Sequence, residues 1–176
     1  MARKITLAEI QSLPDFLTNE AFVLMFGSIP GESDTKRLML QCKTAPIPAE
    51  TVESLEGQIA GYKKHQSGIR TWSGTLSVSF LETKDMAVLK RLRTWQQFCR
   101  GTQTGISVGY SEDYTRTGEV TVFDSTGKVA TTCKIYKMFP TEIPEVSLDS
   151  SGSAAAVEVS VTFSFDYCDY GEETQL

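Results

Sequence analysis

Residues 157–167 alternate strictly between apolar and polar side chains, and this pattern constrains the fold more than any other in the chain. Successive side chains of a strand point to opposite faces, so the stretch predicts one long strand with two different faces. The apolar positions are Val157, Val159, Val161, Phe163, Phe165 and Tyr167. The polar positions are Glu158, Ser160, Thr162, Ser164 and Asp166. The polar face consists of short hydroxyl groups between two acids, and no residue on it is long or basic.

Residues 70–80 repeat this pattern. The apolar positions are Trp72, Leu76, Val78 and Phe80. The opposite positions all carry hydroxyl groups: Thr71, Ser73, Thr75, Ser77 and Ser79. Because this polar face is rare and occurs twice, we expect the two long strands to lie in one sheet.

The chain has 176 residues, which suits a single domain (1–176) with a substantial core. No apolar run approaches the roughly 20 residues of a membrane helix. The basic start, Arg3-Lys4, is not followed by an apolar stretch, so we expect no secretory signal. We therefore expect the protein to be made in the cytosol.

The charge distribution argues against a surface that binds nucleic acid. The net charge is -5, and Lys137 is the last basic residue. Eight acids follow it: Glu142, Glu145, Asp149, Glu158, Asp166, Asp169, Glu172 and Glu173. Proteins that hold DNA neutralise its phosphates with Lys and Arg, so the C-terminal third is expected to repel DNA.

The four cysteines, Cys42, Cys99, Cys133 and Cys168, are far apart and form no C-x-x-C pair, so no zinc site is expected. Free and mostly buried thiols are the first interpretation, and cross-links between subunits are the alternative. Cys168 shares the parity of the polar strand face and Cys99 ends a predicted helix, so the burial of these two is left open.

One amphipathic helix is predicted at about 84–100, capped by Thr83 and Gly101. Its apolar arc comprises Val88, Leu89, Leu92, Trp95 and Cys99, and the arc predicts packing against a sheet. Its bases are Lys84, Lys90, Arg91, Arg93 and Arg100. A solvated face is the first interpretation of these bases, and binding of nucleic acid is the alternative.

Shorter patterns predict further strands. Residues 21–26 form an apolar run expected to be a strand buried on both faces, and 38–43 are expected to form another strand. Residues 119–123 and 129–138 predict a hairpin around the turn 124–127, ended by Phe139-Pro140.

Between residues 46 and 69 no periodic pattern is visible, and a long loop is expected. Connections of this length usually serve a partner or a function. The loop contains the basic cluster Tyr62-Lys63-Lys64-His65, which is interpreted either as solvated or as a contact with an acidic neighbour.

The sequence contains few residues or motifs that are typical of enzyme active sites. His65 is the only histidine, and it lies between a lysine and a glutamine in a polar segment. No nucleotide-binding or metalloprotease motif is present. We therefore do not expect an enzyme, and no metal or cofactor is expected.

Together these patterns predict a mainly β fold: an antiparallel β-sandwich or partial barrel with one packed α-helix. The helix and the other strands would cover one sheet face and leave the hydroxyl face in water. Repetition of the chain around a ring would turn such faces into the wall of a large multi-chain β-barrel with a water-filled lumen. The alternative is a monomeric barrel that binds a small ligand, which requires an enclosed apolar cavity.

The C-terminal part of the chain resembles contractile bacteriophage tail tube proteins, which are related to R-type pyocin tubes and to the type VI secretion tube protein. The residues that carry the resemblance are Tyr136–Ile143, Val146–Asp149 and Val157–Tyr167. The helix followed by a hairpin and the early strands also fit this family.

The resemblance implies a structural virion protein whose hexameric rings stack into a hollow tube that delivers the phage genome. It implies contacts with other copies of the chain and with the tail sheath, tape measure, baseplate and tail terminator proteins. DNA would be passing cargo, and no membrane insertion is implied. The expected location is the virion tail, after assembly in the host bacterial cytoplasm. The tube of a phage-tail-like bacteriocin is an alternative.

With this resemblance, the surfaces can be given expected roles. The expected lumen-facing residues are Glu158, Ser160, Thr162, Ser164, Asp166, Thr71, Ser73, Thr75, Ser77 and Ser79. The candidates for facing the sheath are Lys90, Arg91 and Arg93. The candidates for contacts between rings are Tyr62, Lys63, Lys64 and His65, in the loop 46–69.

Overall fold

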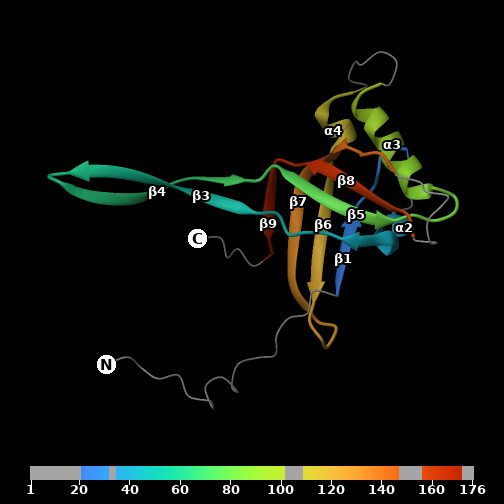
Figure 1. The fold of residues 1–176 in the computed structure, drawn as a ribbon, viewed down its shortest axis with the longest axis horizontal. Helices are drawn as coiled ribbons and strands as arrows, with labels where there is room; N and C mark the ends of the chain where they lie inside the picture. The colour runs from blue at the N-terminus through green and yellow to red at the C-terminus, as the bar shows by residue number, and fades with distance from the viewer. Residues whose placement is uncertain (1–20, 32–34, 102–108, 147–155, 172–176) are drawn as a thin grey trace.

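The computed structural model describes residues 21–31, 35–101, 109–146 and 156–171. Its strands are β1 (Phe22–Phe26), β2 (Cys42–Thr44), β3 (Glu50–Ile59), β4 (Tyr62–Trp72), β5 (Thr75–Leu81), β6 (Arg116–Phe123), β7 (Val129–Glu142), β8 (Glu158–Ser164) and β9 (Tyr167–Tyr170). Its helices are α2 (Lys36–Gln41), α3 (Ala87–Cys99) and α4 (Ser111–Tyr114). The predicted mainly β, antiparallel architecture is confirmed, and the body is a nearly closed, barrel-like sheet from which the β3–β4 hairpin projects (Figure 1).

The body is a seven-stranded sheet in which six strands follow the order β1-β6-β7-β8-β5-β2 and the seventh, β9, pairs with β7; all of these pairings are antiparallel. One edge of β7 pairs with β6; the other pairs first with β9 and then with β8. Between these two sections Lys137 has φ 54°, and the register with β6 shifts between Arg116 and Gly118. Such a bulge bends a strand, and here it turns the sheet towards closure.

β7 also continues past the point where Pro140 was expected to end it. Proline lacks an N–H group and is found in sheets at edges and bulges. Here the register with β8 shifts between Pro140 and Glu142, so the proline sits at such an irregularity.

The predicted eleven-residue strand at 157–167 is wrong in its length. β8 ends at Ser164, and β9 begins at Tyr167 after a break. The apolar positions of β8 are buried as expected, but the alternation does not continue through the break: Tyr167 is exposed and Cys168 is buried. The break lies opposite the bend of β7, because the Asp166 N–H donates to the Tyr136 carbonyl at 3.2 Å. Because β7 and its partner strands bend at the same place, the backbone hydrogen bonds between them continue on both sides of the bend.

The predicted continuous strand at 70–80 is also divided. β4 ends at Trp72, and β5 begins at Thr75. Gly74 has φ +68°, a left-handed conformation that glycine adopts without the steric cost a Cβ would bring. The turn separates a projecting strand from a strand of the body, and the sequence pattern runs through it unchanged.

The long loop expected at 46–69 is instead mostly β-structure. β3 and β4 form an antiparallel hairpin that extends away from the body, with Ala60-Gly61 at its tip (Figure 1). Every residue of β3 is exposed, and so is nearly all of β4. Strong periodic patterns arise when one face of an element is buried, so a ribbon with both faces in water carries at most a weak one.

The strand predicted at 38–43 is wrong, because α2 covers Lys36–Gln41 and β2 starts at Cys42. The residues of α2 all have a high or moderate intrinsic preference for helix. A short apolar run does not separate helix from strand by itself. In the helix Leu38 is buried, whereas Leu40 is 85% exposed.

The predicted helix at 84–100 exists as α3, but it begins at Ala87. Thr83 does not cap it, since its hydroxyl donates to the Asp85 carboxylate and Met86 is the N-cap. The apolar arc is confirmed at the buried residues Val88, Leu89, Leu92 and Trp95. Two further helices, α2 and α4, correct the expectation of a single helix.

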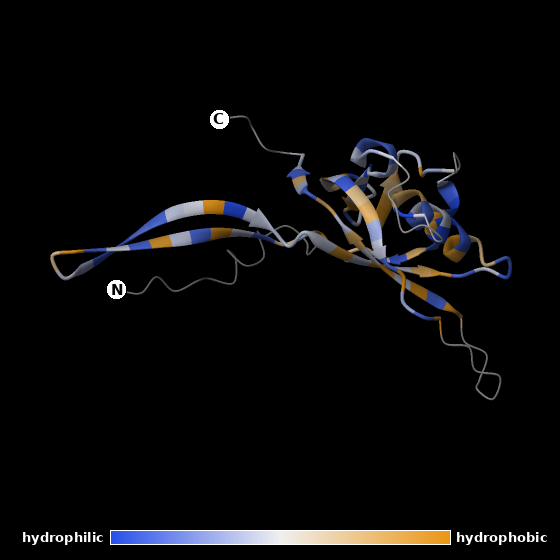
Figure 2. Ribbon diagram, turned by 90° about the horizontal axis from the view of Figure 1, so that it is seen from above, coloured by the Kyte–Doolittle hydropathy of each residue, from blue (hydrophilic) through white to orange (hydrophobic). Residues whose placement is uncertain are grey.

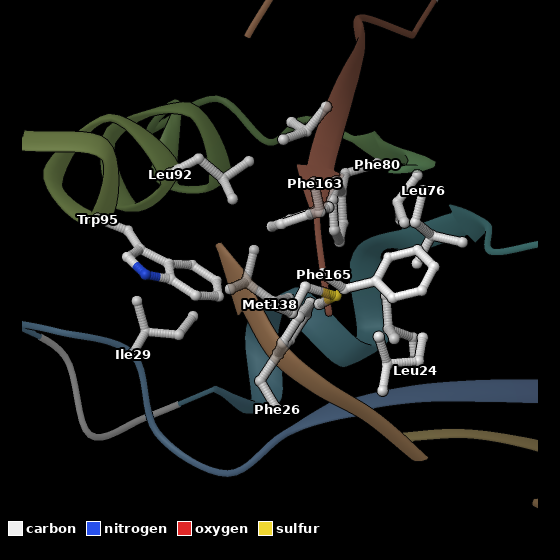
Figure 3. Close-up of a cluster of buried hydrophobic side chains, with 14 of the residues drawn as sticks. Leu24, Phe26, Ile29, Leu76, Phe80, Leu92, Trp95, Met138, Phe163 and Phe165 are labelled. Atoms are coloured by element: carbon white, nitrogen blue, oxygen red, sulfur yellow. The ribbon is translucent and has the colours of Figure 1, made fainter. Parts of the chain in front are cut away.

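The core lies between α3 and the sheet. Trp95 packs edge-on against Phe26 with ring centroids 5.8 Å apart, and its centroid lies 5.7 Å from that of Phe163 (Figure 3). The Trp95 indole N–H donates to the Tyr114 carbonyl at 2.7 Å. β1 is buried on one face only, at Leu24 and Phe26, rather than on both faces as predicted.

Among the described helices, none has the length and apolar character that crossing a membrane would require.

Candidate assembly surfaces

The first candidate surface is the polar side of β5 and β8, which pair in register. Ser77 lies opposite Thr162, and Ser79 lies opposite Ser160. We call this surface the hydroxyl face. Its members are Thr75, Ser77, Ser79, Glu158, Ser160, Thr162 and Ser164, and each of them is exposed or half-buried. The sequence-based expectation that the two hydroxyl-rich stretches share one sheet is therefore met for β5 and β8.

Short side chains on this face bond to each other and to the backbone. Ser77 Oγ lies 3.5 Å from Thr162 Oγ1, and Ser79 Oγ lies 2.5 Å from Thr44 Oγ1 of β2. Ser164 Oγ donates to the Gly74 carbonyl at 3.2 Å. The face is therefore a low, polar surface in which part of the hydrogen-bonding capacity is already used.

Both acids that bracket the pattern have a lysine from another strand beside them, although no residue on the face itself is basic. Lys43 of β2 forms an ion pair with Glu158. Lys137 Nζ lies 3.8 Å from Asp166 Oδ2. The side chains of both pairs are about half exposed. The face is thus closer to neutral than its own two strands suggest, and no local sequence signal joins these partners.

Three expected members of the lumen surface lie elsewhere in the chain. Thr71 belongs to β4 in the projecting hairpin, and Ser73 lies in the connection between β4 and β5. Asp166 lies in the break between β8 and β9. The structure brings together the remaining seven residues of that set.

The second candidate surface is the hairpin, whose two faces differ. Residues opposite each other in an antiparallel pair share a face, and successive pairs alternate. Leu55 opposite Gln66 and Ile59 opposite Tyr62 place three exposed apolar side chains on one face. Figure 2 shows the apolar and polar segments alternating along the ribbon.

The opposite face of the hairpin carries charged residues. The expected basic cluster is split between the two faces. Lys63 and His65 lie on the charged face, whereas Tyr62 and Lys64 lie on the apolar side. Lys63 Nζ is 2.5 Å from Glu56 Oε1, and His65 Nδ1 is 3.4 Å from Ser54 Oγ. The cluster is therefore partly balanced by its own partner strand. The apolar face was missed because Leu55 and Ile59 are separated by glycine and polar residues.

The third candidate surface is the outer side of α3. Lys90 and Arg93 are exposed there, and Arg91 is half-buried. Lys90 Nζ donates to the Asp85 carbonyl at 2.7 Å, which holds the lysine over the start of the helix.

All four thiols are free, and two of them, Cys133 and Cys168, are buried. Burial raises the pKa of Cys42 to about 12, that of Cys99 to about 11 and that of Cys168 to about 12. Thiols with such pKa values stay protonated near neutral pH and react slowly. The buried thiols of β7 and β9 are not available to a second subunit in this fold.

Hollows of about 600 Å³ beside α2 and about 480 Å³ beside β2 lie at the surface of the described chain. The space between α3 and the sheet is filled by the core side chains (Figure 3). Within the described residues, no group of three or more His, Cys, Asp or Glu side chains could hold a metal ion. No observation among these favours the ligand-binding barrel.

Comparison of the fold with solved structures finds proteins of contractile injection systems. The anti-feeding prophage cap, described as the tube-terminating cap, matches with a TM-score of 0.65 at 12% identity over 90% of this chain and 93% of that chain. The sheath/tube terminator of the extracellular contractile injection system PVC matches with a TM-score of 0.64 at 12% identity, over 90% and 99%. A chain of the PVC sheath-tube complex matches with a TM-score of 0.59 at 12% identity, over 95% and 98%. At these identities the likeness shows a shared fold.

The family comparison is decisive. The family model of the phage tail tube protein matches residues 12–171, which is most of the chain. A search of curated proteins finds no match. The fold comparison agrees with the family model, and the resemblance of the sequence to tail tube proteins is confirmed. The chain therefore belongs to the phage tail tube protein family, whose role is structural.

Proposed function

We propose that this chain forms hexameric rings that stack into a tail tube, with the hydroxyl face lining the lumen. The observation that carries this proposal is the hydroxyl face on β5 and β8, where Ser77 and Ser160 are exposed, within the described part of the chain, at the centre of two paired strands. The other side of the same strands is buried in the core. Protein interfaces have apolar cores, whereas on β5 and β8 this face exposes only one large apolar side chain, Leu81 at its end opposite Glu158, which favours contact with water over contact with protein.

A hydroxyl surface whose nearby lysines lie beside acids suits a channel for DNA. Binding of DNA depends on lysine and arginine groups that neutralise phosphates. The two lysines near this face, Lys43 and Lys137, already lie beside Glu158 and Asp166. Their positive charge is therefore offset locally, and a passing polyanion would find little to hold it. Asp166 lies at the margin of the face, so Glu158 and the hydroxyls carry the lumen proposal.

The other two surfaces suit contacts with neighbours. The hairpin extends far from the body and exposes Leu55, Ile59 and Tyr62, and such side chains are favourable to bury against another copy in the next ring. On α3, the exposed Lys90 and Arg93 face away from the core and are available to a sheath protein. Contacts with tape measure, baseplate and terminator proteins belong to the same proposal.

A second candidate function is a terminator that closes the end of a tube. Two of the similar structures are terminators, with TM-scores of 0.65 and 0.64, against 0.59 for the sheath-tube complex. A tube subunit polymerises into stacks of many rings, whereas a terminator stops at one ring. Both roles are compatible with a phage tail and with a phage-tail-like particle.

Assembly and lumen are tested in one series of experiments. Negative-stain microscopy of the purified chain should reveal rings or tubes with a central channel. Stacked tubes support the tube subunit, and single rings support the terminator. A monomer at all concentrations would contradict both. A phage whose tube contains Ser77→Lys and Ser160→Lys should assemble normally and eject DNA on the order of tenfold more slowly, because the new charges line the path of the phosphates.

The control for this series is the double variant Thr117→Lys and Ser125→Lys, which adds the same two charges at exposed positions of β6 and of the turn after it, outside the hydroxyl face. It should leave the rate of DNA ejection unchanged. Ejection at the wild-type rate from fully assembled tubes that carry both lysines on the hydroxyl face would overturn the lumen assignment. Ring formation would then still stand as an independent result.

A further inference from the structure

The direction of the β3–β4 hairpin must be set at its base. Along its length both faces of the ribbon are exposed, so no core holds it against the body. A strand rises about 3.4 Å per residue, so ten residues of β3 reach about 34 Å. At that length a rotation of about 10° at the base moves the tip by about 6 Å. A small rotation at the base therefore causes a large displacement of the tip.

Three aromatic rings from three strands meet at this base. Tyr136 of β7 and Tyr167 of β9 stack with centroids 4.6 Å apart and an angle of 15° between their planes. Trp72, the last residue of β4, lies 6.4 Å from Tyr167 at an angle of 60°. Trp72 is partly buried and also packs against the core. Its indole N–H is buried and finds no acceptor among the described residues, so ring packing holds it in place.

Backbone hydrogen bonds surround these rings and bind both connections of the hairpin. The Ser73 N–H donates to the Ala49 carbonyl at 3.0 Å, which joins the two strands at their exit from the body. The Tyr170 hydroxyl donates to the Pro48 carbonyl at 2.7 Å. The Gly74 carbonyl accepts the Phe165 N–H at 3.1 Å. Each hydrogen bond holds one position of the connecting backbone. The ring contacts join the end of β4 to β7 and β9 of the body.

We propose that Trp72, Tyr136 and Tyr167 form an aromatic anchor that fixes the direction of the β3–β4 hairpin relative to the body. Aromatic side chains have few rotatable bonds and large contact surfaces, so a stack of them resists bending at little cost in side-chain entropy. The anchor uses β7, which bends at Lys137, and β9, which pairs with β7 just before that bend. It is a property of the single chain and goes beyond the proposed tube function.

The test measures the spread of distances between the hairpin and the body. Spin labels are attached to ketone-bearing unnatural residues at Gln58, near the tip, and at Thr126, in the turn between β6 and β7. Pulsed electron spin resonance is recorded on the monomer fraction, diluted with unlabelled chain. The wild-type chain should give one narrow distribution. Trp72→Ala and Tyr167→Ala should each broaden it at least about twofold, whereas Trp72→Phe and Tyr167→Phe, which keep a ring, should leave it narrow.

Two controls separate the anchor from general damage. Val129→Ala shortens an exposed apolar side chain outside the base and should leave the distribution unchanged. Tyr170→Phe removes the hydroxyl bond to Pro48 and keeps the ring, so it measures the bond alone. Circular dichroism establishes that each variant is folded. A folded Trp72→Ala, Tyr167→Ala double variant with the wild-type width would overturn the anchor. Equal broadening by the phenylalanine variants would also overturn it. Neither outcome depends on ring assembly.

Discussion

Glu158 illustrates how neighbours change the meaning of a residue. In the sequence it is an unpaired acid on a hydroxyl-lined strand. In the fold Lys43, which is 115 positions away, forms an ion pair with it. Exposed ion pairs of this kind contribute about 0–1 kcal/mol to stability. The pair therefore matters less for folding than for the electrostatic potential of the face, which it brings towards neutrality.

The partly buried thiols yield a prediction at the same scale. The pKa of Cys42 is about 12 and that of Cys99 is about 11, both raised by burial. Because the thiolate is the nucleophile, iodoacetamide at pH 8 should modify both residues at least about 100-fold more slowly in the folded chain than in urea. The rate in the folded chain should rise about tenfold per pH unit towards these pKa values.

Mass spectrometry of peptides after timed alkylation measures each rate, and the unfolded chain serves as the internal control. Modification of either cysteine at the rate of the unfolded chain would contradict the raised pKa values. The same slow reactivity argues against cross-links between subunits through these thiols. Particles that run as covalent dimers on non-reducing gels would contradict that conclusion.

At the scale of elements, α3 was predictable because its apolar positions recur with the helical period. Its start was not, because Thr83 bonds with Asp85 instead of capping the helix. α2 was missed because six residues are too few to establish a period. The hairpin was missed for a different reason: neither of its faces is buried, so its apolar positions are too few to form a clear strand pattern.

α3 contributes to stability chiefly through its buried face. Leu92 is fully buried, so Leu92→Ala should lower the free energy of unfolding by about 2–5 kcal/mol. Gln97 is exposed on the same helix, and Gln97→Ala should change it by less than about 0.5 kcal/mol. Urea unfolding followed by circular dichroism measures both. Equal effects of the two substitutions would contradict the packing of α3 on the sheet.

At the scale of the whole molecule, the body and the hairpin have separate tasks. The body holds the described core, whereas among the residues of β3 and β4 only Trp72, at the base of the hairpin, packs against it. Folding of the body should therefore not depend on the hairpin, while contact between rings should. This division predicts that the hairpin can be removed at a defined position.

Glu50 and Trp72 lie directly opposite each other, so residues 51–71 can be replaced by Asn-Gly, which favours a two-residue turn. The shortened chain should keep its melting temperature within about 4 °C, because little buried surface is lost. It should not stack into tubes. Calorimetry and negative-stain microscopy measure the two effects. Tubes of normal length from the shortened chain would contradict the role of the hairpin between rings, and an unfolded body would contradict the division of tasks.

The sequence by itself determined the β class, the two hydroxyl-lined strands, the helix with its apolar arc and the family. These properties are carried by local periodicity and by the C-terminal residues on which the resemblance to the family rests. The tertiary structure decided where the long strands break, that residues 50–72 form a projecting hairpin, and which lysines lie beside Glu158 and Asp166. A bend needs a partner strand that bends with it, and an ion pair needs residues brought together by pairing. Both depend on contacts between distant positions, which a local pattern does not record.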